Sequence, residues 1–234
     1  MIEIGGQRLE TTLPGRQGRQ LFAYLVLNRH RLAGRDELVE ALWRGQPAAG
    51  ETGLNPLISK LRKALGADVV DGRSSLRLRL DADARVDVEV AEAAVHKAES
   101  RLALGDDVSA WGPSLVALFI AEREFLPGDE APWIDDRRRL LGQIAHRALE
   151  AYALAALGTG GTELPAAVRA GRQLVKLLPL RETGYLVLMR ALAVQGNVAE
   201  ALRVYADLCE VLREQLGVSP SEATQAVHLS LLRA

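Results

Sequence analysis

The 234-residue sequence contains a single cysteine, Cys209, and only 4% aromatic residues. One cysteine cannot form an intramolecular disulfide, which excludes a disulfide framework and is typical of a reducing cytoplasm. Even the longest apolar runs, such as residues 151–157, are far shorter than the roughly 18 to 20 residues that span a bilayer. The first twenty residues carry arginines without an apolar stretch, unlike a secretory signal. We therefore expect a cytoplasmic protein that has no membrane partner.

Residue groups with the spacing of catalytic or metal sites are also missing. The histidines are scattered along the chain, at His30, His96, His146 and His228. One cysteine cannot complete a zinc motif. The glycine-rich residues 158–162 lack the Gly-Lys-Ser/Thr ending of a phosphate-binding loop and follow a helical pattern, which indicates a helix–helix turn. We predict no catalytic residue, no metal site and no cofactor, and hence no enzyme.

Charge is unevenly distributed along a chain whose formal net charge is only −1. Residues 1–80 hold 13 Lys and Arg against 8 Asp and Glu, a net charge of +5. Residues 81–234 hold 16 against 22, a net charge of −6. A basic N-terminal third beside an acidic remainder indicates an anionic partner for the first part alone.

The N-terminal part mixes strand and helix patterns. Residues 1–6 alternate and stop at a glycine pair, as in a short strand followed by a turn. Helical patterns follow after Pro14-Gly15, from Gly34 as N-cap to Trp43, and up to Leu65 with Gly66 after it. Residues 69–80, with a turn at Asp71-Gly72, indicate a hairpin. This order predicts a winged helix-turn-helix domain over residues 1–85.

From residue 88 onward, helical patterns follow one another, separated by Gly, Pro and Asn. Their predicted ranges are 88–104, 109–124, 133–157, 164–178, 182–195, 198–216 and 221–232, the last with Ser219 as N-cap and Pro220 at its first position. Helix pairs of about 34 residues indicate a tetratricopeptide-like arrangement, with an irregular helical bundle as the alternative. We predict a mainly α protein, with a tetratricopeptide-like α-helical domain over residues 86–234.

The third helix is the candidate for nucleic-acid recognition. Its apolar residues fall within about 60° of Leu54 on a helical wheel, at Leu57, Ile58, Leu61 and Leu65. The opposite face carries no acidic residue and consists of Asn55, Ser59, Lys60, Arg62 and Lys63. Arg and Lys donate to guanine in the major groove, whereas a merely solvated face usually mixes charges of both signs. The hairpin adds Arg73, Arg77 and Arg79, where a wing contacts the DNA backbone or minor groove.

Pro56 leaves the start of this helix open. A proline beyond the first turn of a helix removes a backbone hydrogen bond and bends the helix. Either Asn55 is the N-cap and Pro56 the first helical residue, or an earlier turn from Thr52 is distorted. Residues 45–50, rich in Gly, Ala and Pro, are predicted to form the preceding loop.

Residues 20–27, 35–43 and 58–66 resemble the DNA-binding domain of the Streptomyces antibiotic regulatory protein family. Residues 179–183, 188–192, 196, 200–202, 205 and 216–220 resemble the bacterial transcriptional activator domain that follows it in that family. The resemblance implies a winged helix related to response-regulator output domains, followed by tetratricopeptide-like helices. It also implies binding of double-stranded DNA at direct repeats, a homodimer on that DNA, and recruitment of RNA polymerase.

We interpret the chain as a sequence-specific DNA-binding transcriptional regulator that acts as an activator. Carried over from the family, the DNA contacts fall on Ser59, Lys60, Arg62 and Lys63, with Asn55 beside them. The alternative is a tetratricopeptide-like scaffold for protein interactions with a degenerate DNA-binding domain. The intact basic face of the third helix favours DNA.

Overall fold

The computed structural model describes residues 3–4, 7–8, 12–44, 47–66, 68–81 and 84–233. The chain divides into two compact units. Met1–Val86 and Glu124–Arg139 form the first unit, and Asp87–Arg123 and Leu140–Ala234 form the second. Each unit has a hydrophobic core of its own.

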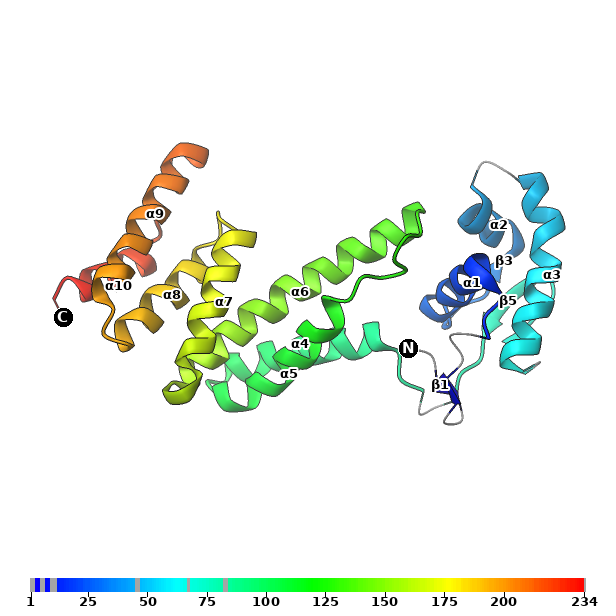
Figure 1. Ribbon diagram of the computed structural model, residues 1–234, viewed down its shortest axis with the longest axis horizontal. Coiled ribbons are helices and arrows are strands. Elements are labelled where there is room, and N and C mark those ends of the chain that lie inside the picture. Colours follow the sequence, from blue (N-terminus) through cyan, green and yellow to red (C-terminus); the bar gives the residue numbers. More distant parts are fainter. Residues whose placement is uncertain are drawn as a thin grey trace. The chain divides into compact units, whose positions relative to one another are not determined.

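The first unit is a helix-turn-helix with a β-hairpin wing, as the sequence predicts (Figure 1). Its elements are β1 (Glu3–Ile4), β2 (Gln7–Arg8), α1 (Gly15–Leu27), β3 (Ala33–Gly34), α2 (Arg35–Trp43), α3 (Pro47–Leu65), β4 (Val70–Asp71) and β5 (Ser75–Leu78). β1 pairs with β2, and the second sheet is antiparallel in the order β3-β5-β4. Ala33 lies opposite Leu76, and Val70 lies opposite Leu78, which sets the register of the wing.

The inner face of α3 packs into the core of the first unit. Every apolar residue expected on this face is at most 7% exposed, namely Leu54, Leu57, Ile58, Leu61 and Leu65. They meet Leu21 of α1 and Leu38 of α2, both fully buried. The helical periodicity of the sequence is therefore confirmed as the packing face of α3.

The expected loop over residues 45–50 is wrong for residues 47–50, which form the first turn of α3; residues 45–46 lie outside the described residues. Close packing against α2 explains the small residues in this segment. A Cβ on Gly50 would lie 2.4 Å from Cγ1 of Val39, and one on Gly53 would lie 2.8 Å from Cζ2 of Trp43. The glycines therefore let two helices approach, and Pro56 lies within α3 instead of at its start.

The second part of the first unit is a segment from beyond the winged helix, residues 124–139. It contains the first two turns of α6 (Pro132–Thr159). Nε1 of Trp133 donates to the carbonyl oxygen of Ala41 at 3.1 Å, and its ring meets Tyr24 edge-on with centroids 5.2 Å apart. Arg16 of α1 forms an ion pair with Asp129, whose side chain is 4% exposed. This segment therefore packs on α1 and α2.

All regular secondary structure in the described part of the second unit is helical. Besides the rest of α6, it contains α4 (Asp87–Ala103), α5 (Asp107–Ala121), the 3₁₀ turn η1 (Gly161–Glu163), α7 (Leu164–Leu177), α8 (Glu182–Val194), α9 (Val198–Leu216) and α10 (Glu222–Leu231). These bounds agree with the predicted ranges to within three residues. The expected N-cap Ser219 is wrong: Ser221 caps α10, and its Oγ accepts a hydrogen bond from the backbone N–H of Thr224. No helix of the described chain is long and apolar enough to cross a membrane.

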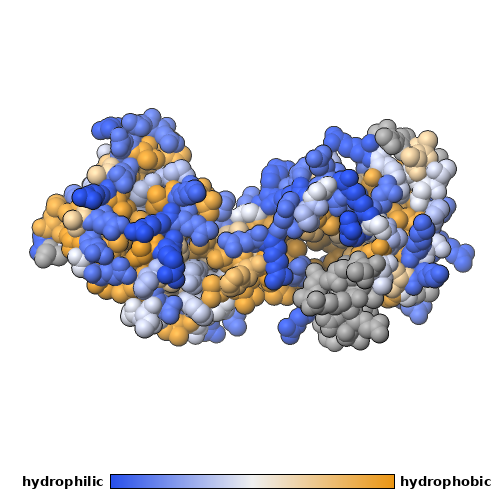
Figure 2. All heavy atoms as spheres, viewed as in Figure 1, coloured by the Kyte–Doolittle hydropathy of each residue, from blue (hydrophilic) through white to orange (hydrophobic). Residues whose placement is uncertain are grey.

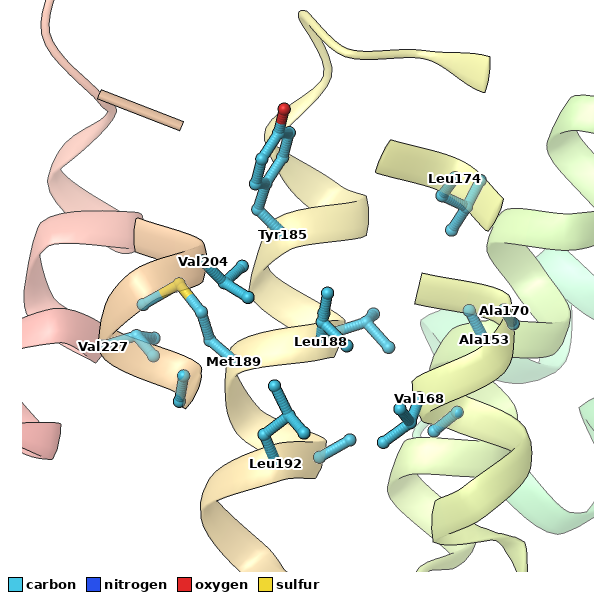
Figure 3. Packing of buried hydrophobic residues seen from close by; sticks show 14 of the residues in the cluster. Ala153, Val168, Ala170, Leu174, Tyr185, Leu188, Met189, Leu192, Val204 and Val227 are labelled. Carbon is cyan, nitrogen blue, oxygen red and sulfur yellow. The ribbon is translucent and has the colours of Figure 1, made fainter. Parts of the chain in front are cut away.

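The core of the second unit is built around α8, which is buried on two sides. Leu188 faces the α7 side, where Ala170 and Leu174 lie, and Met189 faces Val204 and Val227 of α9 and α10 (Figure 3). Apolar residues also reach the surface over α8, α9 and α10, interleaved with hydrophilic ones (Figure 2). α8 packs against both α7 and α9, and these packed helices form the tetratricopeptide-like helical domain that the sequence predicts.

Candidate nucleic-acid interface

The outward side of α3 presents a continuous polar and basic surface, which we call the α3 face. It consists of six exposed residues, Thr52, Asn55, Pro56, Ser59, Lys60 and Lys63. Their spacing of three or four residues places them in one row along the helix. None of the side chains described on the α3 face is acidic, so no carboxylate opposes an approaching anion.

Lys60 and Lys63 carry the free positive charge of the α3 face. Both side chains are exposed, and within the described ranges neither forms an ion pair. A lysine ammonium without a counter-charge adds to the positive potential that attracts phosphate. Ser59 lies beside them with an exposed hydroxyl, which can donate or accept a hydrogen bond.

Arg62, expected to be a DNA contact, is bound to the wing. Its Nε donates to the carbonyl oxygen of Val70 at 3.0 Å, and its Nη2 donates to that of Gly72 at 2.5 Å. The side chain is half-buried. Hydrogen bonds from a charged donor are stronger than neutral ones, so Arg62 fixes the wing relative to α3.

Arg35, at the first position of α2, joins three parts of the site. Its Nη2 donates to Oδ1 of Asn55 at 2.6 Å, and its Nη1 donates to the carbonyl oxygen of Arg73 at 3.1 Å. With Ser59 and Arg62, these residues line an open groove of about 410 Å³ between α3 and the wing. Sequence reasoning missed Arg35. One feature of the sequence could have indicated it: a cation in the first turn of a helix is disfavoured by the helix dipole, so an arginine there is expected to bind another group.

The wing arginines divide into paired and unpaired side chains. Arg79 lies 2.7 Å and Arg77 3.6 Å from the carboxylate of Asp71 on the opposite strand. Arg73 is exposed and forms no ion pair with any residue that the structure describes. Pairs as exposed as those with Asp71 contribute little to stability, so both arginines can exchange the carboxylate for a phosphate.

A second groove, of about 430 Å³, lies on the other side of α3. It is lined by the start of α1 and by α3, at Pro14, Gly15, Gln17, Gly53, Pro56, Leu57 and Lys60. Lys60 therefore stands at the rim of this groove, while Asn55 and Ser59 border the groove next to the wing. The α3 face is the ridge between two hollows, a shape that can enter a groove of a duplex.

An ion-pair cluster holds the start of α2 behind this surface. Glu37 accepts hydrogen bonds from the guanidinium of Arg31, from the hydroxyl of Tyr24, and from the backbone N–H of Gly34 at 3.3 Å. Arg31 lowers the pKa of Glu37 to about 2, against an ordinary value of 4.5. The N-cap predicted at Gly34 is confirmed, and Glu37 fixes the entry of the chain into α2.

Comparisons with known proteins match both parts of the chain. The family model described as bacterial transcriptional activator domain matches residues 86–232, and the one described as transcriptional regulatory protein, C terminal, matches residues 10–78. The regulatory protein AfsR of Streptomyces coelicolor is 32% identical over 231 residues, which cover 98% of this chain and 23% of AfsR. The transcriptional regulatory protein MoaR1 of Mycobacterium bovis is 27% identical over 256 residues, which cover 99% of this chain and 76% of MoaR1.

A solved structure has the same fold. Mycobacterium tuberculosis EmbR, in complex with a low affinity phosphopeptide, superposes with a TM-score of 0.79 at 24% identity. The match covers 94% of this chain and 60% of that chain. The chain thus spans about a quarter of the AfsR relatives and more than half of the EmbR chain.

Proposed function

The chain belongs to the family of the bacterial transcriptional activator domain, and we propose that it is a sequence-specific activator that binds double-stranded DNA through the α3 face. The observation that carries this proposal is the positive charge of Lys60 and Lys63, which have no ion pair with a described residue and lie on a row without described carboxylates. A helix with its side chains is about 10 to 12 Å across, close to the width of a B-DNA major groove, and the row from Asn55 to Lys63 runs for about 12 Å along it at 1.5 Å per residue.

Each predicted contact takes a role from its surroundings. Asn55, Ser59, Lys60 and Lys63 reach base edges or the adjoining phosphates, because they are the outermost side chains of α3. Arg73 contacts the backbone or the minor groove from the wing, and Arg77 and Arg79 join it by leaving Asp71. Arg62 contributes to DNA binding by holding the wing in position beside α3.

Titration of labelled DNA tests this assignment. The full chain first selects a binding sequence from a random pool, and the affinity for that DNA is measured at several salt concentrations. We expect Lys60→Ala and Lys63→Ala each to weaken binding by about 1 to 3 kcal/mol where they contact bases, or to reduce the salt slope by about one where they contact phosphates. Lys97→Ala, an exposed lysine of α4, is the matched control. Wild-type affinity and salt slope in both α3 variants would place recognition elsewhere.

We further propose that two copies bind direct repeats head-to-tail, since one winged helix contacts about half of a usual site. Repeats spaced by roughly 10 to 11 base pairs present the same face of the duplex to both copies. Moving one repeat by about five base pairs turns it to the opposite face and should abolish cooperativity. Mass measurement on DNA with both spacings decides this, and equal cooperativity on both would contradict it.

We propose that residues 1–85 form the DNA-binding domain and residues 86–234 form the activator domain, which contacts RNA polymerase in the cytoplasm. Transcription in vitro with purified polymerase tests the activator role: added protein should raise the transcript from a template that carries the selected site. A protein-interaction scaffold is the second candidate, favoured by exposed apolar side chains such as Val194 at 67% and Leu232 at 59%. Absence of selective DNA binding would favour the scaffold.

A further inference from the structure

Asn55 of the α3 face is held in one orientation by Arg35. Nη2 of Arg35 lies 2.6 Å from Oδ1 of Asn55, while Nη1 of the same guanidinium donates to the carbonyl oxygen of Arg73 at 3.1 Å. A guanidinium carries donors and no acceptor, so the amide atom that faces it must be the oxygen. Nδ2 of Asn55 has no hydrogen-bond partner among the residues that the structure describes, and the side chain is exposed. The residue therefore offers its N–H donors outward.

This orientation limits what Asn55 can recognise. A free asparagine pairs with adenine by using its oxygen for the N6 amino group and its nitrogen for N7. Here Arg35 occupies a lone pair of that oxygen and adds a positive charge beside it, and both effects disfavour an amino group at this place. Guanine presents two acceptors, N7 and O6, and no donor on its major-groove edge. An asparagine that offers its N–H donors beside a fixed positive charge fits guanine best.

We propose that Asn55 and Arg35 form a pair that presents donors and so selects guanine at the base facing Asn55, with Arg35 as the positioning residue that sets the choice. The inference rests on the proposed binding of DNA through the α3 face. Arg35 is suited to this role because its second hydrogen bond, to the backbone of Arg73, fixes the guanidinium to the wing. Both ends of the planar guanidinium are hydrogen-bonded, so the group stays in place. It has no acceptor to offer the amide nitrogen of Asn55, and the amide therefore cannot flip.

Selection of binding sites from random DNA by the full chain tests the pair. The wild type should enrich guanine at one position of each repeat, by about tenfold over adenine, the size expected for a good pair of base contacts. Asn55→Ala should lose the preference at that position alone. Arg35→Met keeps an apolar stem but has no donor, so the amide oxygen of Asn55 becomes free. Asn55 can then pair with adenine through both its oxygen and its nitrogen, and the selected base should shift toward adenine. Arg203→Met, an exposed arginine of α9, is the matched control and should leave the selected sequence unchanged.

A second variant keeps the test decisive if Arg35→Met fails to fold, as judged by circular dichroism. Asn55→Asp retains the contact with Arg35 but offers only acceptors, so the position should change to cytosine, whose amino group is a donor. Guanine retained in the folded Arg35→Met variant, or in Asn55→Asp, would overturn the inference. So would an Asn55→Ala variant that selects the wild-type sequence. Failure of the wild type to enrich any sequence is a distinct result, which would refute the proposed function itself.

Discussion

Replacing Trp133 by alanine should loosen the winged helix, although Trp133 lies almost fifty residues beyond it in the sequence. The substitution removes the hydrogen bond from Nε1 to Ala41, the edge-on contact with Tyr24, and the contact with Phe125 at 6.1 Å between ring centroids. Truncating a fully buried tryptophan costs about 3 to 5 kcal/mol. Trp133 is half-buried, which reduces this to about 2 kcal/mol, and the lost hydrogen bond adds about 1 kcal/mol. We expect the unfolding free energy of the first unit to fall by about 2 to 4 kcal/mol in total.

Hydrogen exchange on the full chain measures this loss where it occurs. Because each 1.4 kcal/mol is a factor of ten, the amides of α1 and α2 should lose about 30- to 1,000-fold of their protection. Trp133→Phe keeps an aromatic ring and should lose only about tenfold. Phe119→Ala, which removes a side chain 64% exposed on α5, is the control and should leave α1 and α2 unchanged. Wild-type protection of α1 and α2 in Trp133→Ala would refute the inclusion of residues 124–139 in the first folding unit.

Three further expectations follow from single contacts. Arg62→Ala removes the two hydrogen bonds from Arg62 to the wing and should lower the unfolding free energy of the first unit by about 1 to 3 kcal/mol in urea titrations; an unchanged midpoint would contradict this. The pKa of Glu37, about 2 in the folded state and near 4.5 when unfolded, means that its stabilisation is present above about pH 4.5 and is lost as pH falls toward 2. The thermal midpoint of Glu37→Gln should therefore lie below that of the wild type at pH 7 and converge with it near pH 2, and a constant gap would argue against the ion pair. Cleavage between residues 80 and 88 should give two fragments that elute together in native size exclusion, since the start of α6 stays packed on α1 and α2; separate elution would contradict that packing.

The helices of the second unit could be predicted because each begins or ends at a local signal. Gly160 and Gly161 follow α6 with positive φ, and Gly217 ends α9 in the left-handed conformation. Such signals act within a few residues, so sequence reasoning places them well. It failed at Ser219 because two serines lie two residues apart, and only the hydrogen bond from Thr224 to Ser221 distinguishes them.

Features that depend on distant partners could not be predicted. The glycines in residues 45–53 indicate a turn when only local conformation is considered, but Gly50 and Gly53 serve the approach of α3 to α2. The contact between Trp133 and Ala41 joins residues 92 positions apart, and no neighbouring residue in the sequence indicates it. In both cases the preference of a segment is overridden by packing against another element.

In the candidate site, too, the features set by helical periodicity could be predicted, whereas the hydrogen-bond partners of the side chains could not. The exposed row of α3 follows from helical periodicity, since the buried stripe fixes which side faces outward. The sequence predicts Lys60, Arg62 and Lys63 of α3 alike as DNA contacts, but in the structure the arginines and lysines around this face differ in their partners. Arg62 and Arg35 use planar, multiply donating guanidinium groups to bind carbonyl and amide oxygens of the site itself, whereas Lys60 and Lys63 have no ion pair with a described residue. This division matches the two side chains: a guanidinium can hold two acceptors in a fixed geometry, and a flexible ammonium cannot. Rigid arginines that shape the surface, with lysines left to meet an anion, are what a preorganised binding surface requires.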